Sequence, residues 1–171
     1  MPDLINQLVR LRVPLGFLFG FAALWLARPT SSTLAAGFGV ALAGEALRVW
    51  AAGHLEKGRE ITRSGPYCFV AHPLYLGSAI IGLGTAIASA SLIVALLVAV
   101  YLVATVLPAI RAEEKWLRAT YKDEYDAYRA TRRASTSRRF SVTRAMANRE
   151  HRAVAGLVAA AALLAFKVWW R

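Results

Sequence analysis

The chain has 171 residues, 57% of them hydrophobic, and a mean hydropathy of +0.44. This length is enough for one domain and hardly two, and the apolar share exceeds that of an ordinary soluble domain. The net charge of +11 would suit a nucleic-acid-binding protein, but the basic residues are confined to segments beside long apolar blocks. The composition therefore argues against a soluble domain and against nucleic acid as a partner, and it favours a single membrane domain over residues 1–171.

Apolar blocks recur along the whole chain. A bilayer-spanning helix needs about 20 mostly apolar residues. We predict five transmembrane helices, at Val13–Ala27, Leu34–Gly53, Leu74–Ala90, Leu92–Ile110 and Ala153–Trp170. Arg10 and Arg12 precede the first block, as in a signal peptide. No small-x-small cleavage site follows, so we expect this helix to be retained.

The charges are distributed unequally between the connecting segments. Residues 111–152 hold 12 Lys/Arg and 6 Asp/Glu, and the loop 54–72 holds three more basic residues, whereas the turn 88–91 holds no charge. The positive-inside rule then places the N-terminus and both basic segments in the cytoplasm, and the turns 28–33 and 88–91 and the C-terminus outside. We expect a multi-pass protein of the cytoplasmic (inner) membrane, with the lipid bilayer as a partner through basic juxtamembrane residues.

The residue types argue against metal and disulfide chemistry. Cys68 is the single cysteine, so the chain forms no internal disulfide and no thiolate cluster. His54, His72 and His151 lack a ligand spacing with carboxylates or cysteines, and we expect no metal site.

An aromatic stripe follows the fourth apolar block. Its spacing of four, four and three residues is typical of one helical face, and it consists of Leu117, Tyr121, Tyr125 and Tyr128. Glu113 lies four residues before the stripe and joins it, whereas Glu114 is rotated by about 100°. We predict one amphipathic cytosolic helix that continues from the fourth span. The basic stretch TRRASTSRRFSVTR after it has no periodicity and is expected to be a loosely ordered connector on the headgroups.

Two ionisable residues, Glu45 and Arg48, lie inside the second apolar block, three residues apart on one helical face. Ionisable groups at membrane depth usually face a cavity or a partner. One interpretation is a local ion pair near the cytoplasmic boundary, with the arginine extended toward water. The other is that both residues line a polar substrate or cofactor cavity.

The uncharged stretch SGPYCFVAHPLYLG, residues 64–77, separates the second and third blocks. Pro73 sets the start of the third helix, where proline is well tolerated, and His72 then lies at that helix N-terminus with Tyr75 one turn further on. Backbone N–H groups at a helix start favour anionic ligand groups. The alternative is a helix-entry turn with interfacial tyrosines.

In combination these motifs resemble a known family. A GPY…HPLYLG loop, a membrane hairpin and then an EE…L…Y…EY..Y helix, over about Arg48–Arg129, are similar to the isoprenylcysteine carboxyl methyltransferase and phospholipid methyltransferase superfamily. The resemblance implies a bacterial integral membrane methyltransferase that uses S-adenosyl-L-methionine without a Rossmann fold, which agrees with the lack of a strand–GxGxxG–helix unit. Its core would span residues 45–130, followed by a C-terminal transmembrane helix at 153–170.

The resemblance also implies site residues. The cofactor, which leaves as S-adenosyl-L-homocysteine, would be bound from the cytosol by Arg59, Glu60, Ile61, Thr62, Tyr67, His72, Pro73, Leu74, Tyr75, Glu113 and Glu114. A lipophilic or isoprenylcysteine-like acceptor would enter from the bilayer and meet Arg111, Arg48 and Glu45. Methyl transfer is a single in-line displacement, so positioning supplies most of the rate. A dedicated base is required only if the acceptor loses a proton, and no catalytic residue is assigned.

One departure from the family pattern concerns the residue before His72. The family motif usually reads R-H-P or R-N-P, and here Ala71 replaces the arginine. The absence of this arginine argues against an isoprenylcysteine carboxylate as the acceptor. Two alternative hypotheses for the function are an NADPH-dependent enzyme of the sterol-reductase type and a catalytically degenerate membrane scaffold.

Overall fold

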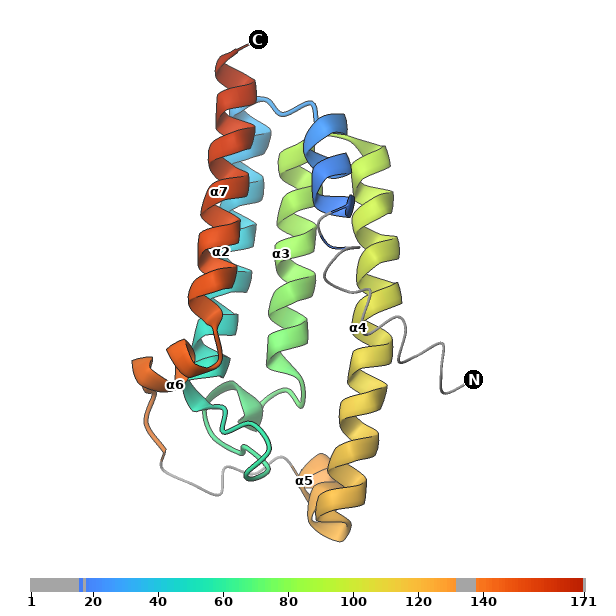
Figure 1. The fold of residues 1–171 in the computed structure, drawn as a ribbon, viewed down its shortest axis with the longest axis vertical. Helices are drawn as coiled ribbons and strands as arrows, with labels where there is room; N and C mark the ends of the chain where they lie inside the picture. The colour runs from blue at the N-terminus through green and yellow to red at the C-terminus, as the bar shows by residue number, and fades with distance from the viewer. Residues whose placement is uncertain (1–15, 17, 132–137, 171) are drawn as a thin grey trace.

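The computed structural model describes residues 16, 18–131 and 138–170. Their regular structure is all helical, without a strand, which confirms the predicted all-α class for this part of the chain. A short helix at residues 18–26 is followed by α2 (Ser31–His54), the 3-10 helix η1 (Gly65–Cys68), α3 (Pro73–Ser89), α4 (Leu92–Tyr121), α5 (Asp123–Thr131), α6 (Val142–Ala147) and α7 (Glu150–Trp169). The long helices run along a common axis, with α5 and α6 at one end (Figure 1).

Three of these helices, α2, α4 and α7, are long and apolar enough to cross a membrane. They coincide with the predicted second, fourth and fifth spans. The apolar α3 coincides with the third but has only 17 residues. Of the first predicted span, residues 13–15 and 17 lie outside the described residues, while 18–26 are helical. The arrangement with five spans therefore stays a prediction.

The helix ends follow from local sequence signals. Thr30 caps α2 in a reciprocal capping box: its Oγ1 accepts from Thr33 N at 3.2 Å, and its own N donates to Thr33 Oγ1 at 2.9 Å. Pro73 is the first residue of α3, as predicted. At the other end of α3, Ala90 has a φ of 48°, and Ser91 caps the next helix, so the chain reverses within two residues.

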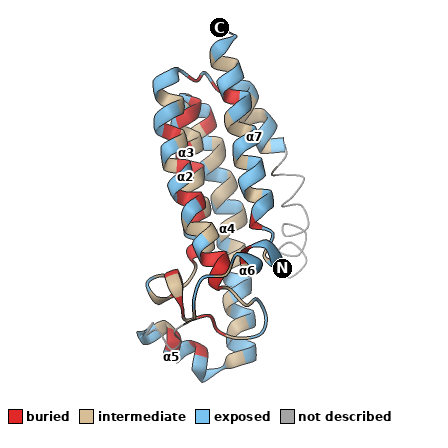
Figure 2. Cartoon of the chain, turned by 90° about the vertical axis from the view of Figure 1, so that its left-hand side faces the viewer, coloured by how far each residue is buried: buried red, intermediate tan, exposed pale blue. Residues whose placement is uncertain are grey.

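Helices α2 and α3 pack closely because glycines face each other. A Cβ at Gly44 would lie 2.7 Å from the carbonyl oxygen of Gly77, and a Cβ at Gly84 would lie 2.5 Å from the backbone N of Ala41. Figure 2 shows buried residues gathered along this seam, whereas α7 is mostly exposed. Small residues let helix backbones approach closely and gain dispersion contacts.

The prediction of one helix continuing from the fourth span is wrong beyond Tyr121. The helix α4 ends there, Lys122 has a φ of 46°, and α5 begins at Asp123 and folds back along α4 (Figure 1). Arg129 Nη1 consequently lies 3.3 Å from Glu114 Oε1. In one straight helix these residues would be about 22 Å apart at 1.5 Å per residue. Periodicity alone could not reveal the break, since the stripe continues across it.

The prediction of a loosely ordered connector is wrong for residues 141–144, which form the cap and the start of α6. Ser141 caps the short α6, and its backbone N donates to Gly53 O at 3.1 Å. Asn148 then donates to Ala52 O and Leu55 O at 2.9 and 3.0 Å. These bonds satisfy carbonyls at the C-terminus of α2, which need partners outside the helix. Residues 132–137, also part of that predicted connector, lie outside the described residues.

Candidate functional site

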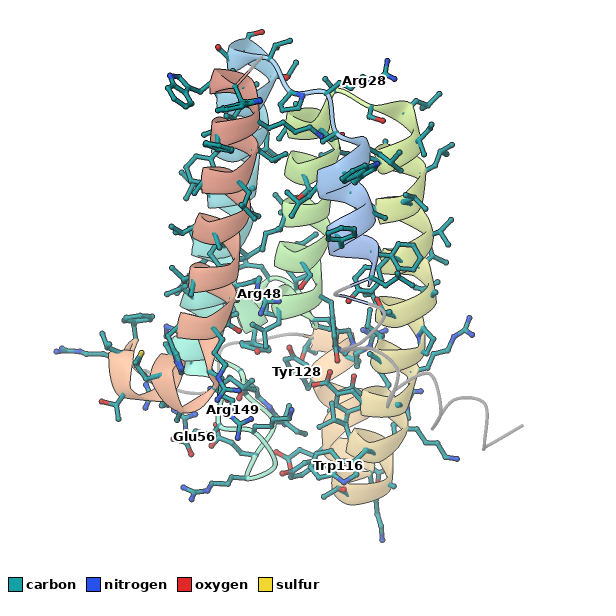
Figure 3. The ribbon with its side chains drawn as sticks, turned by 45° about the horizontal axis from the view of Figure 1, so that its top comes forward. Arg28, Arg48, Glu56, Trp116, Tyr128 and Arg149 are labelled. Atoms are coloured by element: carbon teal, nitrogen blue, oxygen red, sulfur yellow. The ribbon has the colours of Figure 1, made fainter. Side chains whose placement is uncertain are left out.

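A cavity of about 670 Å³ lies between α3, α4, α5 and the loop that follows α2. Its wall on α4 runs from Tyr101 to Leu117, a distance of about 24 Å along a straight helix. In Figure 3, Arg48 lies toward the helical bundle, while Tyr128 and Trp116 lie toward the α5 end. We call the two ends the bundle end and the loop end. The volume is typical of small-molecule sites.

A second hollow between α2 and α7, of about 780 Å³, is larger. Its lining is apolar apart from Ser31, and it contains no charged residue. Recognition of a polar ligand needs a few placed polar groups. The cavity beside α5 is therefore the better candidate for chemistry.

The start of α3 forms one wall of the cavity and is tied to α4. His72 is the residue before the helix, and its Nε2 lies 3.1 Å from Glu114 Oε1, while its Nδ1 lies 4.0 Å from Glu113 Oε2. Because Glu114 also pairs with Arg129, this histidine connects α3, α4 and α5. The imidazole is therefore held in place by carboxylates of α4.

The loop before α3 places Tyr67 in the wall. Gly65 has a φ of 59°, and a Cβ there would lie 2.5 Å from the ring of His54, so this turn requires glycine. Tyr128 Oη donates to the backbone O of Tyr67 at 2.8 Å. Burial raises the pKa of Tyr67, so its phenol is neutral at physiological pH.

The aromatic residues of α5 close the loop end. Tyr125 and Tyr128 are buried against Ile61, with Leu117 and Tyr121 packed around them, so the predicted stripe does form one cluster. Tyr125 is 1% exposed, and its Oη has no hydrogen-bond partner among the described residues. Burial, and then the nearby Glu114, raise the pKa of this phenol and keep it neutral. A buried hydroxyl without a partner is rare and points to a missing ligand or water.

The segment 59–62 contributes three of its four residues to the wall. Ile61 and Thr62 are buried, and Glu60 faces both the cavity and Arg138, whose Nη2 donates to its Oε2 at 2.9 Å. This hydrogen bond raises the pKa of the Arg138 guanidinium. Arg59 is exposed and does not line the cavity.

At the bundle end, a buried charged cluster surrounds Arg48. Its Nε lies 3.7 Å from Glu45 Oε2, its Nη2 lies 2.9 Å from Glu150 Oε1, and its Nη1 donates to Ser78 Oγ at 2.5 Å. Both carboxylate side chains are 7% exposed, and the oxygens of Glu45 accept no hydrogen bond from the described residues. Of the predicted pair, Arg48 lines the cavity and Glu45 lies behind it.

Most of the predicted site residues meet at this cavity. Its wall contains Glu60, Ile61, Thr62, Tyr67, His72, Pro73, Leu74, Tyr75, Glu113 and Arg48. Four predicted residues are outside the wall: Arg59, Glu114, Arg111 and Glu45. Glu114 nevertheless contacts the site through His72.

The sequence interpretation missed several wall residues. Tyr125 and Tyr128 were predicted only as members of the helical stripe, and Trp116 was not singled out, yet all three line the cavity. Asn148 comes from the stretch before α7, about 75 residues away from the motif that it joins. No local signal distinguishes it, because its place depends on the docking of α6.

The chemistry of the wall suits a ligand that combines positive charge with a flat ring. Tyr67, Tyr75, Trp116 and Tyr125 offer aromatic surfaces, and Glu113 adds a carboxylate that is 43% exposed. Aromatic faces attract cations and also stack on flat ligands. The hydroxyl of Tyr125, without a partner among the described residues, supplies a polar contact within this surface.

One of three comparisons with known proteins gives a match. Residues 44–124 match the family model described as phospholipid methyltransferase. Searches of curated proteins and of solved structures return no match. The matched range includes α3, α4 and the loop before them, and ends where α5 begins.

Proposed function

From the match of residues 44–124 to the phospholipid methyltransferase family we propose that the chain is an S-adenosyl-L-methionine-dependent membrane methyltransferase. The observation that carries the proposal is that the motif residues inside the match, His72, Tyr75 and Glu113, line one cavity. That cavity extends from the loop end into the bundle, so two ligands can meet within it.

We place the cofactor at the loop end. When bound, S-adenosyl-L-methionine supplies an electrophilic methyl group on a sulfonium. Glu113 and the faces of Tyr67 and Tyr75 suit its cationic groups, the start of α3 suits its carboxylate, and Ile61 and Thr62 contact the adenosyl part. The orphan hydroxyl of Tyr125 gives one further hydrogen bond.

Three of the predicted cofactor residues act in this proposal from outside the wall or at its edge. Glu114 positions His72 by accepting from its ring, at 3.1 Å. Glu60 holds the loop through its pair with Arg138. Arg59 is exposed at the surface, where its guanidinium could pair with the carboxylate of the cofactor as it enters.

We place the acceptor at the bundle end, with its reacting head near Arg48 and Ser78 and its apolar part along Leu102 and Val106. Arg111 is exposed on α4 and would contact lipid headgroups or the acceptor on its way in. Holding two reactants in line lowers the barrier chiefly through orientation. A separate base is needed only for an acceptor that must lose a proton.

In the membrane, we propose that the predicted first span at 13–27 and the helices α2, α3, α4 and α7 all cross the bilayer as a single domain. The N-terminus and the loop end would face the cytoplasm, because basic segments remain on that side. The cofactor would then enter from the cytosol and a lipophilic acceptor from the bilayer of the inner membrane.

Calorimetric titration of S-adenosyl-L-homocysteine into the full chain in lipid nanodiscs tests the proposal, with NADPH titrated in parallel. We expect saturable binding at one site for the first ligand and no binding for NADPH. Binding of NADPH alone would support a reductase. If a protein with the expected helical circular dichroism and cooperative unfolding binds neither ligand, it is a scaffold and not a methyltransferase.

A further inference from the structure

The bundle end of the cavity contains a buried charged cluster that the proposed function leaves unexplained. Arg48 reaches the wall, and Glu45 and Glu150 lie behind it within 3.7 and 2.9 Å of the guanidinium. Glu150 is the first residue of α7 and lies outside the family match. The cluster therefore joins a matched helix to an unmatched one.

Both Nη atoms of Arg48 are engaged in hydrogen bonds. Its Nη2 bonds both oxygens of Glu150, at 2.9 and 3.0 Å, and its Nη1 donates to Ser78 Oγ. Its Nε faces Glu45 without a hydrogen bond. An arginine that binds an anionic ligand needs a free edge for a bidentate contact. This guanidinium has none to offer.

The charge of the cluster also opposes an anion. Glu45 and Glu150 against Arg48 give a net charge of −1, and a proton on Glu45 would give zero. In neither protonation state of Glu45 does the cluster carry a net positive charge. The facing part of α4, from Leu92 to Ile110, contains no ionisable residue except Tyr101, so among the described residues nothing on α4 reverses this balance.

We propose that Glu150 and Glu45 determine acceptor specificity: they make the bundle end accept neutral or cationic heads and reject anionic ones such as carboxylates. The identification of the ligand as a methyl acceptor rests on the proposed function, whereas the charge argument concerns the cavity alone. Juxtaposed like charges in a buried site suppress binding strongly. Glu150 acts through Arg48 by keeping its guanidinium occupied.

The test uses two radiolabelled probes with the same chain, dodecylammonium and dodecanoate, bound at equilibrium to the full chain in phosphatidylcholine nanodiscs. Empty nanodiscs give the partition into lipid, which is subtracted. We expect the wild-type protein to bind the ammonium probe about tenfold more tightly than the carboxylate. Equal affinities, or tighter binding of the carboxylate, would overturn the inference.

Two variants sharpen the test. Glu150→Gln releases Arg48, so the carboxylate probe should gain about tenfold and the preference should disappear or invert. Glu45→Gln removes a carboxylate that accepts no hydrogen bond, so the fold should tolerate it, and the preference should fall in the same direction. Glu124→Gln, a charge-matched change at a side chain that is 61% exposed, is the control. Variants of Glu45 and Glu150 that bind like this control would contradict the inference.

Titration of S-adenosyl-L-homocysteine into the same samples separates the two claims. Cofactor binding without probe selectivity sinks the specificity inference and leaves the methyltransferase proposal standing. Selectivity without cofactor binding sinks the methyltransferase proposal and supports a cavity selective for the charge of an amphiphile's head.

Discussion

The two sides of α3 are built in opposite ways. Toward α2, glycines on both helices bring backbones so close that a single Cβ at Gly44 would clash. Toward α4, larger side chains intervene, and the two helices enclose the cavity from Tyr101 down to Leu117. The closed side gives α3 a rigid support, and the open side gives its first turn, with His72 and Tyr75, a space to face.

This contrast explains why the motif lies at the start of α3. Groups at a site must be held by packing that the ligand does not disturb. Here the seam with α2 supplies that packing on one face while the opposite face lines the cavity. Replacing residues on each side should therefore have different consequences.

The largest effect is expected at the closed side, from Gly84→Leu. A Cβ there already lies 2.5 Å from Ala41 N, so the larger side chain must separate the two backbones. Overpacking of this kind costs about 3 kcal/mol or more. Thermal unfolding in detergent should show a large loss of stability, or no folded protein. Gly39→Leu on the outer face of α2 is the matched control, because nothing lies within 4 Å of its Cβ position. Equal stability of the two variants would contradict the close packing.

On the open side, Glu113→Gln should weaken S-adenosyl-L-homocysteine binding without loss of fold. Losing a charged contact to a ligand cation costs about 1.5–3 kcal/mol, which is roughly a 10- to 150-fold loss of affinity. Calorimetry measures the change, and Tyr75→Ala should behave alike. Unchanged affinity in both variants, with Glu124→Gln as the charge-matched control, would remove these residues from the proposed pocket.

Tyr125→Phe should have smaller effects, which are opposite in sign for stability and for ligand affinity. Removing a buried hydroxyl without a partner should stabilise the free protein by about 1 kcal/mol, because that group has lost its water. Binding of S-adenosyl-L-homocysteine should instead weaken by up to about tenfold. Unfolding and calorimetry on the same variant check both signs. Tyr121→Phe, outside the cavity wall, should change neither, and equal behaviour of the two variants would show that Tyr125 contacts no ligand.

The smallest effect concerns the break that turns α5 back over the open side. Lys122 has a φ of 46°, a conformation that glycine adopts with less strain. Lys122→Gly should therefore raise the free energy of unfolding by about 1 kcal/mol. Lys122→Ala, which removes the same side chain but keeps a Cβ, should not. If both variants lose stability, the strain at this position is absent.

Much of the fold could be predicted from the sequence because its signals are local. The proline at the start of α3 and the apolar lengths of α4 and α7 are signals of this kind, because each is set within one continuous segment. The break at Lys122 was not predicted, since Tyr125 and Tyr128 keep the helical spacing across it. Their positions became clear only from the contacts with Ile61 and Tyr67.

The sequence by itself determined the helical class, the apolar segments and the motif residues that gather at one cavity. Only the tertiary structure decided that Glu114 supports His72 from behind, that Tyr125 presents a hydroxyl without a protein partner, and that Glu150 occupies Arg48. The physical reason is the sequence separation between the residues that interact. A cap or an apolar segment is set by near neighbours, whereas the contact between Arg48 and Glu150 joins residues 102 positions apart, and it exists only once α6 and α7 have docked on α2.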